Sequence, residues 1–207
     1  MSVRLRTWPS ALASAIVGGT LFGFIVSAVN GAEIPALVPL SLVIGVGWFW
    51  AAVAFLLGRL AVGRQRSAVV GGVVLVFAVC AYYVTDVFEG VYEVVDYSDP
   101  TGAATSTDWS AFGNNALFWS VISLFVGPFF GVMGMGSRRG DVIGLMFKLA
   151  LPAIAAVEMV FRLRYDMGLL DNSIMTTTWI AVLISALAIA VGLVVRHLVR
   201  LSSHPGR

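Results

Sequence analysis

The chain has 207 residues, of which 59% are hydrophobic and 12% are charged, with a formal net charge of +2 and a mean hydropathy of +0.93. Soluble domains average roughly 45–50% apolar and about 25% charged residues, so this composition excludes a soluble globular domain. A single cysteine also excludes a disulfide scaffold. The composition therefore predicts one integral membrane domain over residues 1–207, a helical bundle with no soluble module.

Six stretches of the chain are apolar over the roughly 20 residues that a membrane helix requires. In chain order they are residues 10–29, 36–57, 68–85, 115–135, 142–161 and 178–195. Each stretch is apolar on all sides, whereas the strands of a membrane barrel alternate between apolar and polar residues. The expected fold class is therefore all-α, a polytopic membrane protein with six transmembrane helices.

The first stretch has a second interpretation. Arg4 and Arg6 precede it, and the small residues Ser27 and Ala28 lie near its end, as in a secretory signal peptide. Its apolar run is long for a signal peptide and carries small residues at helical spacing, which favours a membrane span. Cleavage would leave five spans, and the sequence leaves this alternative open.

Ten of the thirteen basic residues fall on one side of the bilayer when the spans alternate in direction. They are Arg4, Arg6, Arg59, Arg64, Arg66, Arg138, Arg139, Arg196, Arg200 and Arg207. Only Arg162 and Arg164 fall on the other side, where most of the acidic residues lie. Because cytoplasmic loops are enriched in Lys and Arg, this pattern predicts a multi-pass protein of the bacterial inner (plasma) membrane with both termini in the cytoplasm.

Small residues at helical spacing in the first and fourth stretches predict close contacts between helices. They are Ala11, Ala15, Gly19 and Gly23 in the first stretch, and Gly127, Gly131 and Gly134 in the fourth. Pro39, Pro128 and Pro152 lie inside the second, fourth and fifth stretches, where a missing backbone hydrogen bond predicts a kink.

Four carboxylates follow the third span. They are Asp86, Glu89, Glu93 and Asp96, at i, i+3, i+7 and i+10. If the helix continues beyond the bilayer, they share an arc of about 80°, with Tyr82 one turn deeper and Gly90 as a weak point. One interpretation is a solvated acidic face. The other is a site for a cationic solute, or for Mg²⁺ or Ca²⁺ at Asp86, Glu89 and Glu93.

Glu158 lies near the outer end of the fifth span, with Arg162 one turn further along the chain, a spacing that allows an ion pair. The pair is either structural, or it joins Asp86 and Glu89 across an outward-facing cavity. Lys148, inside the same span, is expected to extend its ammonium to the cytoplasmic interface.

The chain lacks the residues that several kinds of functional site require. His197 and His204 both follow the last span, so no histidine is placed to act as a buried base or metal ligand. The chain has no Gly-x-x-x-x-Gly-Lys-Ser/Thr loop for ATP phosphates. A net charge of +2 is explained by topology and does not indicate nucleic acid as a partner.

Three segments resemble those of a known family. They are Tyr82-Tyr83-Val84-Thr85-Asp86, the segment from Trp119 through Gly127-Pro128-Phe129-Phe130-Gly131 to Arg138-Arg139-Gly140, and Ala155-Ala156-Val157-Glu158. Over the second to fifth spans the chain resembles an uncharacterised actinobacterial family of small multi-span membrane proteins, a domain of unknown function. The resemblance implies a polytopic inner-membrane location and no activity, and it does not extend to Glu93 or Asp96.

The third, fourth and fifth spans are expected to meet around an outward-facing pocket that binds a ligand. Its candidate substrate-binding residues are Tyr82, Asp86, Glu89, Glu93, Trp119, Glu158 and Arg162. The main hypothesis is a membrane protein that binds or moves a small cationic or amphipathic solute, because an acidic vestibule concentrates cations. Trp50, in the second span, either lines a cavity or faces lipid.

Two alternatives remain open. One is an intramembrane enzyme of the acid-initiated cyclase or isomerase type, in the manner of a membrane-bound terpene cyclase, acting on a lipid or isoprenoid. Its catalytic acids would be Asp86 and Glu158, and its aromatic walls would be Tyr82, Tyr83, Trp119, Phe129 and Phe130. The other is an accessory or immunity-type subunit with no ligand, which packs against a membrane partner or a second copy of itself.

Overall fold

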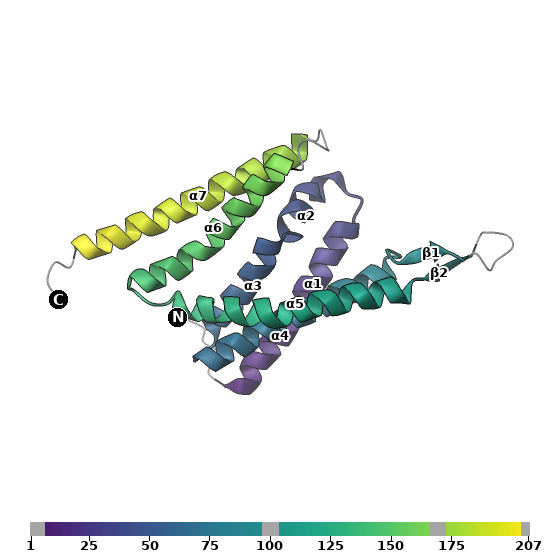
Figure 1. Cartoon of the computed structure of the whole chain (residues 1–207), viewed down its shortest axis with the longest axis horizontal. Coiled ribbons are helices and arrows are strands. Elements are labelled where there is room, and N and C mark those ends of the chain that lie inside the picture. The colour runs from purple at the N-terminus through teal and green to yellow at the C-terminus, as the bar shows by residue number, and fades with distance from the viewer. Residues whose placement is uncertain (1–6, 97–103, 166–172, 204–207) are drawn as a thin grey trace.

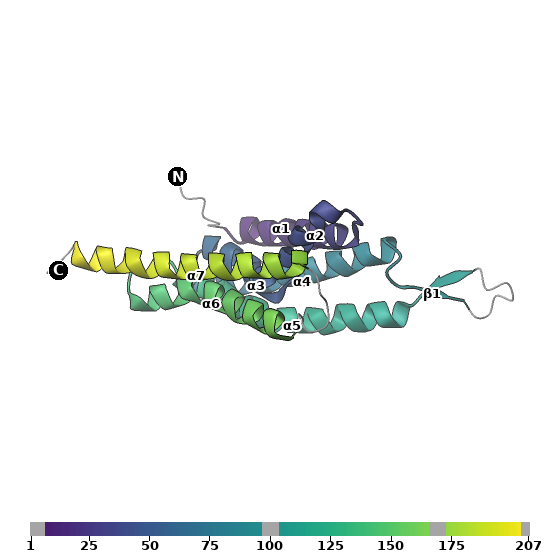
Figure 2. The same cartoon turned by 90° about the horizontal axis from the view of Figure 1, so that it is seen from above.

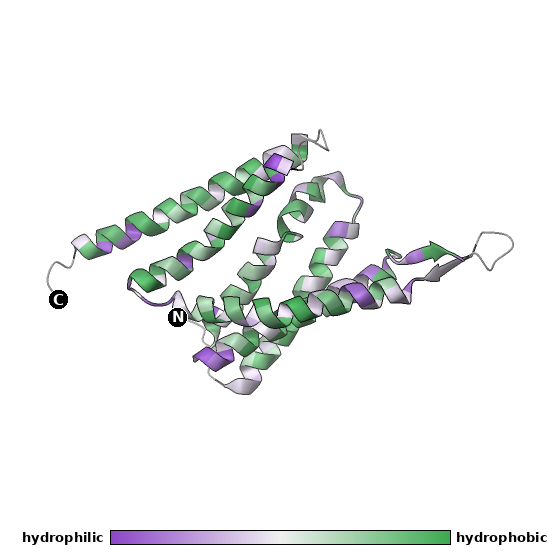
Figure 3. Cartoon of the chain, viewed as in Figure 1, coloured by the Kyte–Doolittle hydropathy of each residue, from purple (hydrophilic) through white to green (hydrophobic). Residues whose placement is uncertain are grey.

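The computed structural model describes residues 7–96, 104–165 and 173–203. The helices long and apolar enough to cross a membrane are α1 (Trp8–Gly31), α4 (Arg64–Phe88), α5 (Trp109–Gly136), α6 (Val142–Tyr165) and α7 (Ser173–Ser202). Apolar residues predominate along all of them (Figure 3). The prediction of an all-α polytopic membrane protein is confirmed, with five to six spans in this part of the chain. Arg4, Arg6, His204 and Arg207 lie outside the described residues, as do Asp99, Asp166 and Asp171, three of the acidic residues that the sequence places on the side opposite the ten basic ones.

The second predicted span is a broken helix. A 3₁₀ turn (η1, Pro35–Leu37) leads into α2 (Val38–Ile44), and α3 (Gly47–Leu60) follows at an angle of 63°. The break lies at residues 45–46, where Gly45, inside the break, and Gly47, directly after it, lower the helix propensity. Pro39 occupies the first turn of α2, a position that tolerates proline, so the predicted kink at this residue is wrong.

The centre of the molecule is α4, against which both α1 and α5 pack (Figure 2). A Cβ atom at Gly19 or Gly23 of α1 would meet backbone atoms of α4. Between α4 and α5, Gly71 and Gly127 face each other backbone to backbone. Gly19, Gly23 and Gly127 therefore make the close helix contacts that their spacing predicts, and Gly71 is the partner of Gly127 on α4.

The last two helices form a separate layer. α6 and α7 run side by side along one flank of the molecule (Figure 1) and pack mainly against each other. Their main contacts with the rest of the bundle are with α2, α3 and α5. The α6–α7 pair is consequently attached to the rest of the bundle by few interactions.

α4 ends at Phe88, so the prediction that one acidic helix continues to Asp96 is wrong. Gly90 adopts a φ of +76°, a conformation that side chains other than glycine rarely adopt. The N–H groups of Gly90 and Val91 donate to carbonyl oxygens of the last turn, which is the Schellman arrangement of a helix end. The glycine therefore stops the helix before the acidic pattern is complete.

A β-hairpin follows this helix end and projects beyond the helices in both views (Figures 1 and 2). Its strands are β1 (Glu93–Val95) and β2 (Thr105–Thr107), paired antiparallel with Glu93 opposite Thr107. Valines at positions 94 and 95 favour a strand over a helix. Glu93 and Asp96 therefore belong to the hairpin and not to a helical ridge.

Basic residues from several segments meet at one end of the bundle. Arg59, at the end of α3, donates from Nη1 to Oγ of Ser137 over 3.1 Å. Arg138 donates to a carbonyl at the end of α3, and Nζ of Lys148 donates to the carbonyl of Arg139 over 3.1 Å. Three of the arginines that alternation places on one side of the membrane, Arg59, Arg138 and Arg139, thus lie at the same end of the bundle.

Asp141 caps the beginning of α6 at this basic end. Its carboxylate accepts a hydrogen bond from the Gly144 N–H over 2.9 Å and one from Nη2 of Arg139 over 2.6 Å. The Arg139 guanidinium is the main reason why the pKa of Asp141 lies below its ordinary value, and the Gly144 amide lowers it further. The ionised carboxylate therefore stabilises the fold at neutral pH.

A pH-dependent contribution to stability follows from Asp141. Because folding lowers its pKa, the contribution is present above the ordinary aspartate pKa of about 4 and disappears as the pH falls through the folded value. We expect Asp141→Asn to lower the melting temperature at pH 7, and the difference from wild type to vanish in acid. Melting curves at stepped pH test this, with Glu33→Gln as an exposed control. A difference independent of pH would contradict it.

Candidate functional site

A pocket of about 420 Å³ lies where α1, α3, α4 and α5 meet. Its lining residues are Val26 and Asn30 from α1, Gly45 and Gly47 from the helix break, Trp50 and Ala51 from α3, Leu75, Val79, Tyr82 and Tyr83 from α4, and Trp119, Ile122, Ser123 and Val126 from α5. None of these residues carries a charge. The pocket is therefore apolar with a few neutral polar groups, which is the common composition of a small-molecule site.

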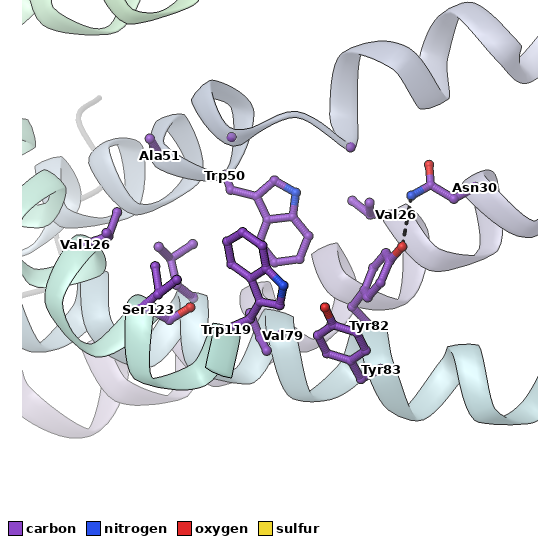
Figure 4. A pocket seen from close by; sticks show the side chains of 14 residues that line it. Val26, Asn30, Trp50, Ala51, Val79, Tyr82, Tyr83, Trp119, Ser123 and Val126 are labelled. Carbon is purple, nitrogen blue, oxygen red and sulfur yellow. Dashed lines mark hydrogen bonds between the residues drawn. The ribbon is translucent and has the colours of Figure 1, made fainter. Parts of the chain in front are cut away.

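Aromatic side chains dominate the walls of the pocket. Figure 4 shows Trp50, Tyr82, Tyr83 and Trp119 around it, contributed by three different helices. The rings of Trp50 and Tyr82 meet edge to face with centroids 5.9 Å apart, and those of Tyr82 and Tyr83 do so at 5.2 Å. Because Trp50, Tyr82 and Tyr83 contact one another, this part of the wall is in place before a ligand binds.

A short chain of hydrogen bonds sets the position of Tyr82. Oγ of Ser41 donates to Oδ1 of Asn30 over 2.7 Å, and Nδ2 of Asn30 donates to the Tyr82 hydroxyl oxygen over 3.3 Å. The chain joins α2, α1 and α4 beside the helix break. Sequence reasoning missed Asn30 and Ser41, although each is a polar residue at or inside an otherwise apolar stretch.

The three carboxylates proposed as a cation site make separate contacts. Asp86 is only 6% exposed and accepts a hydrogen bond of 2.6 Å from Oγ of Ser27 on α1. Glu89 lies against Gly31 at the end of α1, and Glu93 accepts a hydrogen bond of 3.3 Å from Oγ1 of Thr105 in the hairpin. In the described residues, no three His, Cys, Asp or Glu side chains are grouped to hold a metal ion.

Glu158 lies at the break between α2 and α3. Its carboxylate accepts hydrogen bonds from the N–H of Gly47 over 3.3 Å and from the N–H of Trp48 over 3.0 Å. These N–H groups belong to the first turn of α3, which has no side-chain cap of its own. Glu158 therefore caps α3 from a neighbouring helix, where the helix dipole favours a negative charge.

Arg162 completes this capping site. Its Nε and Nη2 donate to Oε1 of Glu158 over 3.3 and 3.2 Å, so the predicted i, i+4 ion pair is present. Its guanidinium also lies 5.9 Å from the ring centroid of Trp179, a buried residue of α7. The pair thus connects α3, α6 and α7.

The predicted site residues therefore separate into two groups. Tyr82 and Trp119 line the aromatic pocket. Trp50, for which the sequence allows either a cavity or a lipid-facing position, lines it as well. The five charged candidates do not line it: they are Asp86, Glu89, Glu93, Glu158 and Arg162. α6, expected to share the pocket, contributes no lining residue in the described structure, and α1 and α3 take its place.

Comparison with protein families, with curated proteins and with solved structures gave no match to this chain. The resemblance to an actinobacterial family stays a prediction. Function is therefore inferred from the geometry of the chain itself.

Proposed function

We propose that this chain is an inner-membrane protein that binds a small amphipathic cation in the aromatic pocket between α1, α3, α4 and α5. The observation that carries the proposal is the set of four aromatic side chains around one uncharged cavity: Trp50, Tyr82, Tyr83 and Trp119. Aromatic faces attract cations such as quaternary ammonium groups, and the attraction reaches about 2 kcal/mol when the cation is desolvated.

The size and surroundings of the pocket fit such a ligand. Its volume of about 420 Å³ is within the range of small-molecule sites. Acidic residues are concentrated beyond the pocket, at the end of α4 and in the hairpin, and they include Asp86, Glu89 and Glu93. Their negative potential raises the local concentration of cations, while the aromatic walls supply the binding contact.

The orientation of the site follows from the charges at the two ends of the bundle. The basic residues gather at the end that contains Arg59, Arg138 and Lys148. If that end is cytoplasmic, as the enrichment of cytoplasmic loops in arginine indicates, both termini are inside and the acidic end faces outward. The ligand then reaches the pocket from outside the cell.

An acid-initiated enzyme is a weaker candidate for this pocket. Such a reaction requires a carboxyl group that faces the substrate. The described lining residues include no aspartate or glutamate: Asp86 is bonded to Ser27, and Glu158 caps α3. Binding without chemistry is the function that the geometry supports best.

Binding of benzyltrimethylammonium tests the proposal, with the uncharged analogue neopentylbenzene as the matched probe. Trp119→Leu keeps an apolar wall but removes the π face, so we expect it to weaken binding of the cation by about thirtyfold, which corresponds to about 2 kcal/mol. Binding of the neutral analogue is expected to change much less. Titration followed by tryptophan fluorescence or calorimetry measures both.

Trp109→Leu is the control for this experiment. Trp109 lies at the start of the same helix α5, is 65% exposed and does not line the pocket. We expect its substitution to leave the affinity unchanged. Equal affinity for the cation and its neutral analogue would contradict the proposed function.

A further inference from the structure

A second cavity lies between the α6–α7 pair and the broken helix α2–α3. It has a volume of about 810 Å³, and side chains from all four helices line it. Most of its lining is apolar and includes Leu40, Val43, Leu151, Pro152, Val182 and Ile189. The cavity follows α7 from Thr177 to Ile189, about 18 Å at 1.5 Å per residue. That length is close to the depth of one bilayer leaflet, about 15 Å.

One cationic side chain lines this groove. Lys148 projects from α6, and its Nζ donates to the carbonyl of Arg139 over 3.1 Å. An ammonium group has three N–H donors, so this bond leaves capacity for a further acceptor. The lysine therefore gives an otherwise apolar groove one charged end.

Most of the charges near Lys148 have the same sign as its own. Arg59 on α3 and Arg196 and Arg200 on α7 lie near enough to Lys148 for their charges to act on it, and Asp141 is the one neighbouring group of opposite sign that acts on it among the described residues. Asp141 is already paired with Arg139. The lysine that lines the groove thus has three further cations near it, from α3 and α7, and its one acidic neighbour is already paired, an arrangement that favours an anion from outside the chain.

We propose that this groove binds an anionic phospholipid of the surrounding bilayer, with an acyl chain along α7 and the phosphate at Lys148. Basic pockets between membrane helices, on the side rich in Lys and Arg, are suited to anionic headgroups. The apolar length of the groove matches the chain of a lipid, and a soluble phosphate has no group to fill it. The lipid would also cover the face where α6–α7 meets the rest of the bundle least closely. This site is separate from the aromatic pocket and does not depend on the function proposed for it.

Competition between two lipids tests the proposal. The purified full chain is mixed with equal amounts of phosphatidylglycerol and phosphatidylcholine that carry identical acyl chains, and native mass spectrometry measures the ratio of the bound lipids. We expect wild type to prefer phosphatidylglycerol at least about fivefold, which is the effect of one basic residue near an anionic lipid. Lys148→Met is expected to lower this preference by about fivefold, and Lys148→Arg to retain it.

Two further variants separate charge from shape. Arg164→Met removes one positive charge from the opposite end of the same helix and is expected to leave the preference unchanged. Val182→Trp fills the groove without altering any charge, so it is expected to reduce binding of both lipids. Equal binding of the two lipids by wild type would overturn the proposal. An unchanged preference in Lys148→Met, or undiminished binding in Val182→Trp, would do the same.

Discussion

Gly127→Leu is expected to separate α4 from α5 and to abolish the folded state in detergent. A Cβ atom at Gly127 would meet the carbonyl group of Gly71 and lie 2.7 Å from Cα of Gly72. All of these atoms belong to the backbone of α4, so no side chain can rotate away to make room. The cost is expected to exceed the roughly 1–3 kcal/mol of ordinary overpacking, because two whole helices must move apart.

A graded series makes this prediction specific. Gly127→Ala introduces only the Cβ atom and is expected to lower the melting temperature clearly, although less than leucine does. Gly113→Ala is the matched control, because Gly113 lies in the same helix and a Cβ there meets nothing within 4 Å. We expect Gly113→Ala to stabilise the chain slightly, by about 0.5–1 kcal/mol of helix propensity. Identical melting curves for Gly127→Ala and wild type would refute the close contact.

The positions of the membrane helices could be predicted because hydropathy is a local property. A stretch of 20 apolar residues has no stable alternative to a helix in lipid, whatever the rest of the chain does. The glycine contacts could be predicted for a similar reason, since Gly127 and Gly131 lie on one face of any helix that contains them. Which helix they meet could not be predicted, because that depends on the arrangement of the whole bundle.

The end of α4 shows where local patterns mislead. Asp86, Glu89, Glu93 and Asp96 have helical spacing, yet the helix ends at Phe88, two residues before Gly90, which adopts a positive φ. The break before α3 is a similar case. Averaging the hydropathy over 20 residues hides the two glycines at the break. The carboxylate that caps the first turn of α3, that of Glu158, is 111 residues further along the chain than Gly47.

The candidate site was predictable only in part, because contacts between helices decide which side chains line it. Aromatic residues at the outer ends of spans were evident, and Tyr82 and Trp119 do line the pocket. Charged residues in or near a membrane suggest functional sites, but here the Asp86 carboxylate accepts a hydrogen bond from Ser27 and does not line the pocket. Such pairings connect different helices, and no spacing within one helix reveals them.

Glu158→Ala is expected to loosen the attachment of α6–α7 to the rest of the bundle. The carboxylate is the acceptor for the N–H groups of Gly47 and Trp48, and it pairs with Arg162. Its loss leaves two N–H groups and a half-buried guanidinium without this partner in a membrane environment. One buried unsatisfied group costs about 1–3 kcal/mol, and a partner lost from a buried ion pair costs about 3–5 kcal/mol. With both side chains a quarter to a third exposed, we expect a loss of about 3 kcal/mol.

Hydrogen exchange distinguishes this capping role from a general loss of stability. In Glu158→Ala, the amides of Gly47 and Trp48 are expected to exchange at least about tenfold faster, while those of the α4–α5 contact keep their protection. Glu158→Gln retains an oxygen acceptor but loses the charge, so its effect is expected to be intermediate. Glu33→Ala, at an exposed glutamate, is expected to change neither segment.

Arg162→Met decides which half of the interaction holds the helices together. This variant removes the ion pair and the contact with the Trp179 ring, but it leaves the carboxylate free to cap α3. If capping is the main interaction, the amides of Gly47 and Trp48 stay protected in Arg162→Met and lose protection only when Glu158 itself is replaced. Equal acceleration in Arg162→Met and Glu158→Ala would instead make the ion pair the main attachment. Unchanged exchange in Glu158→Ala would contradict the capping role, because nothing else in the described structure accepts hydrogen bonds from these two N–H groups.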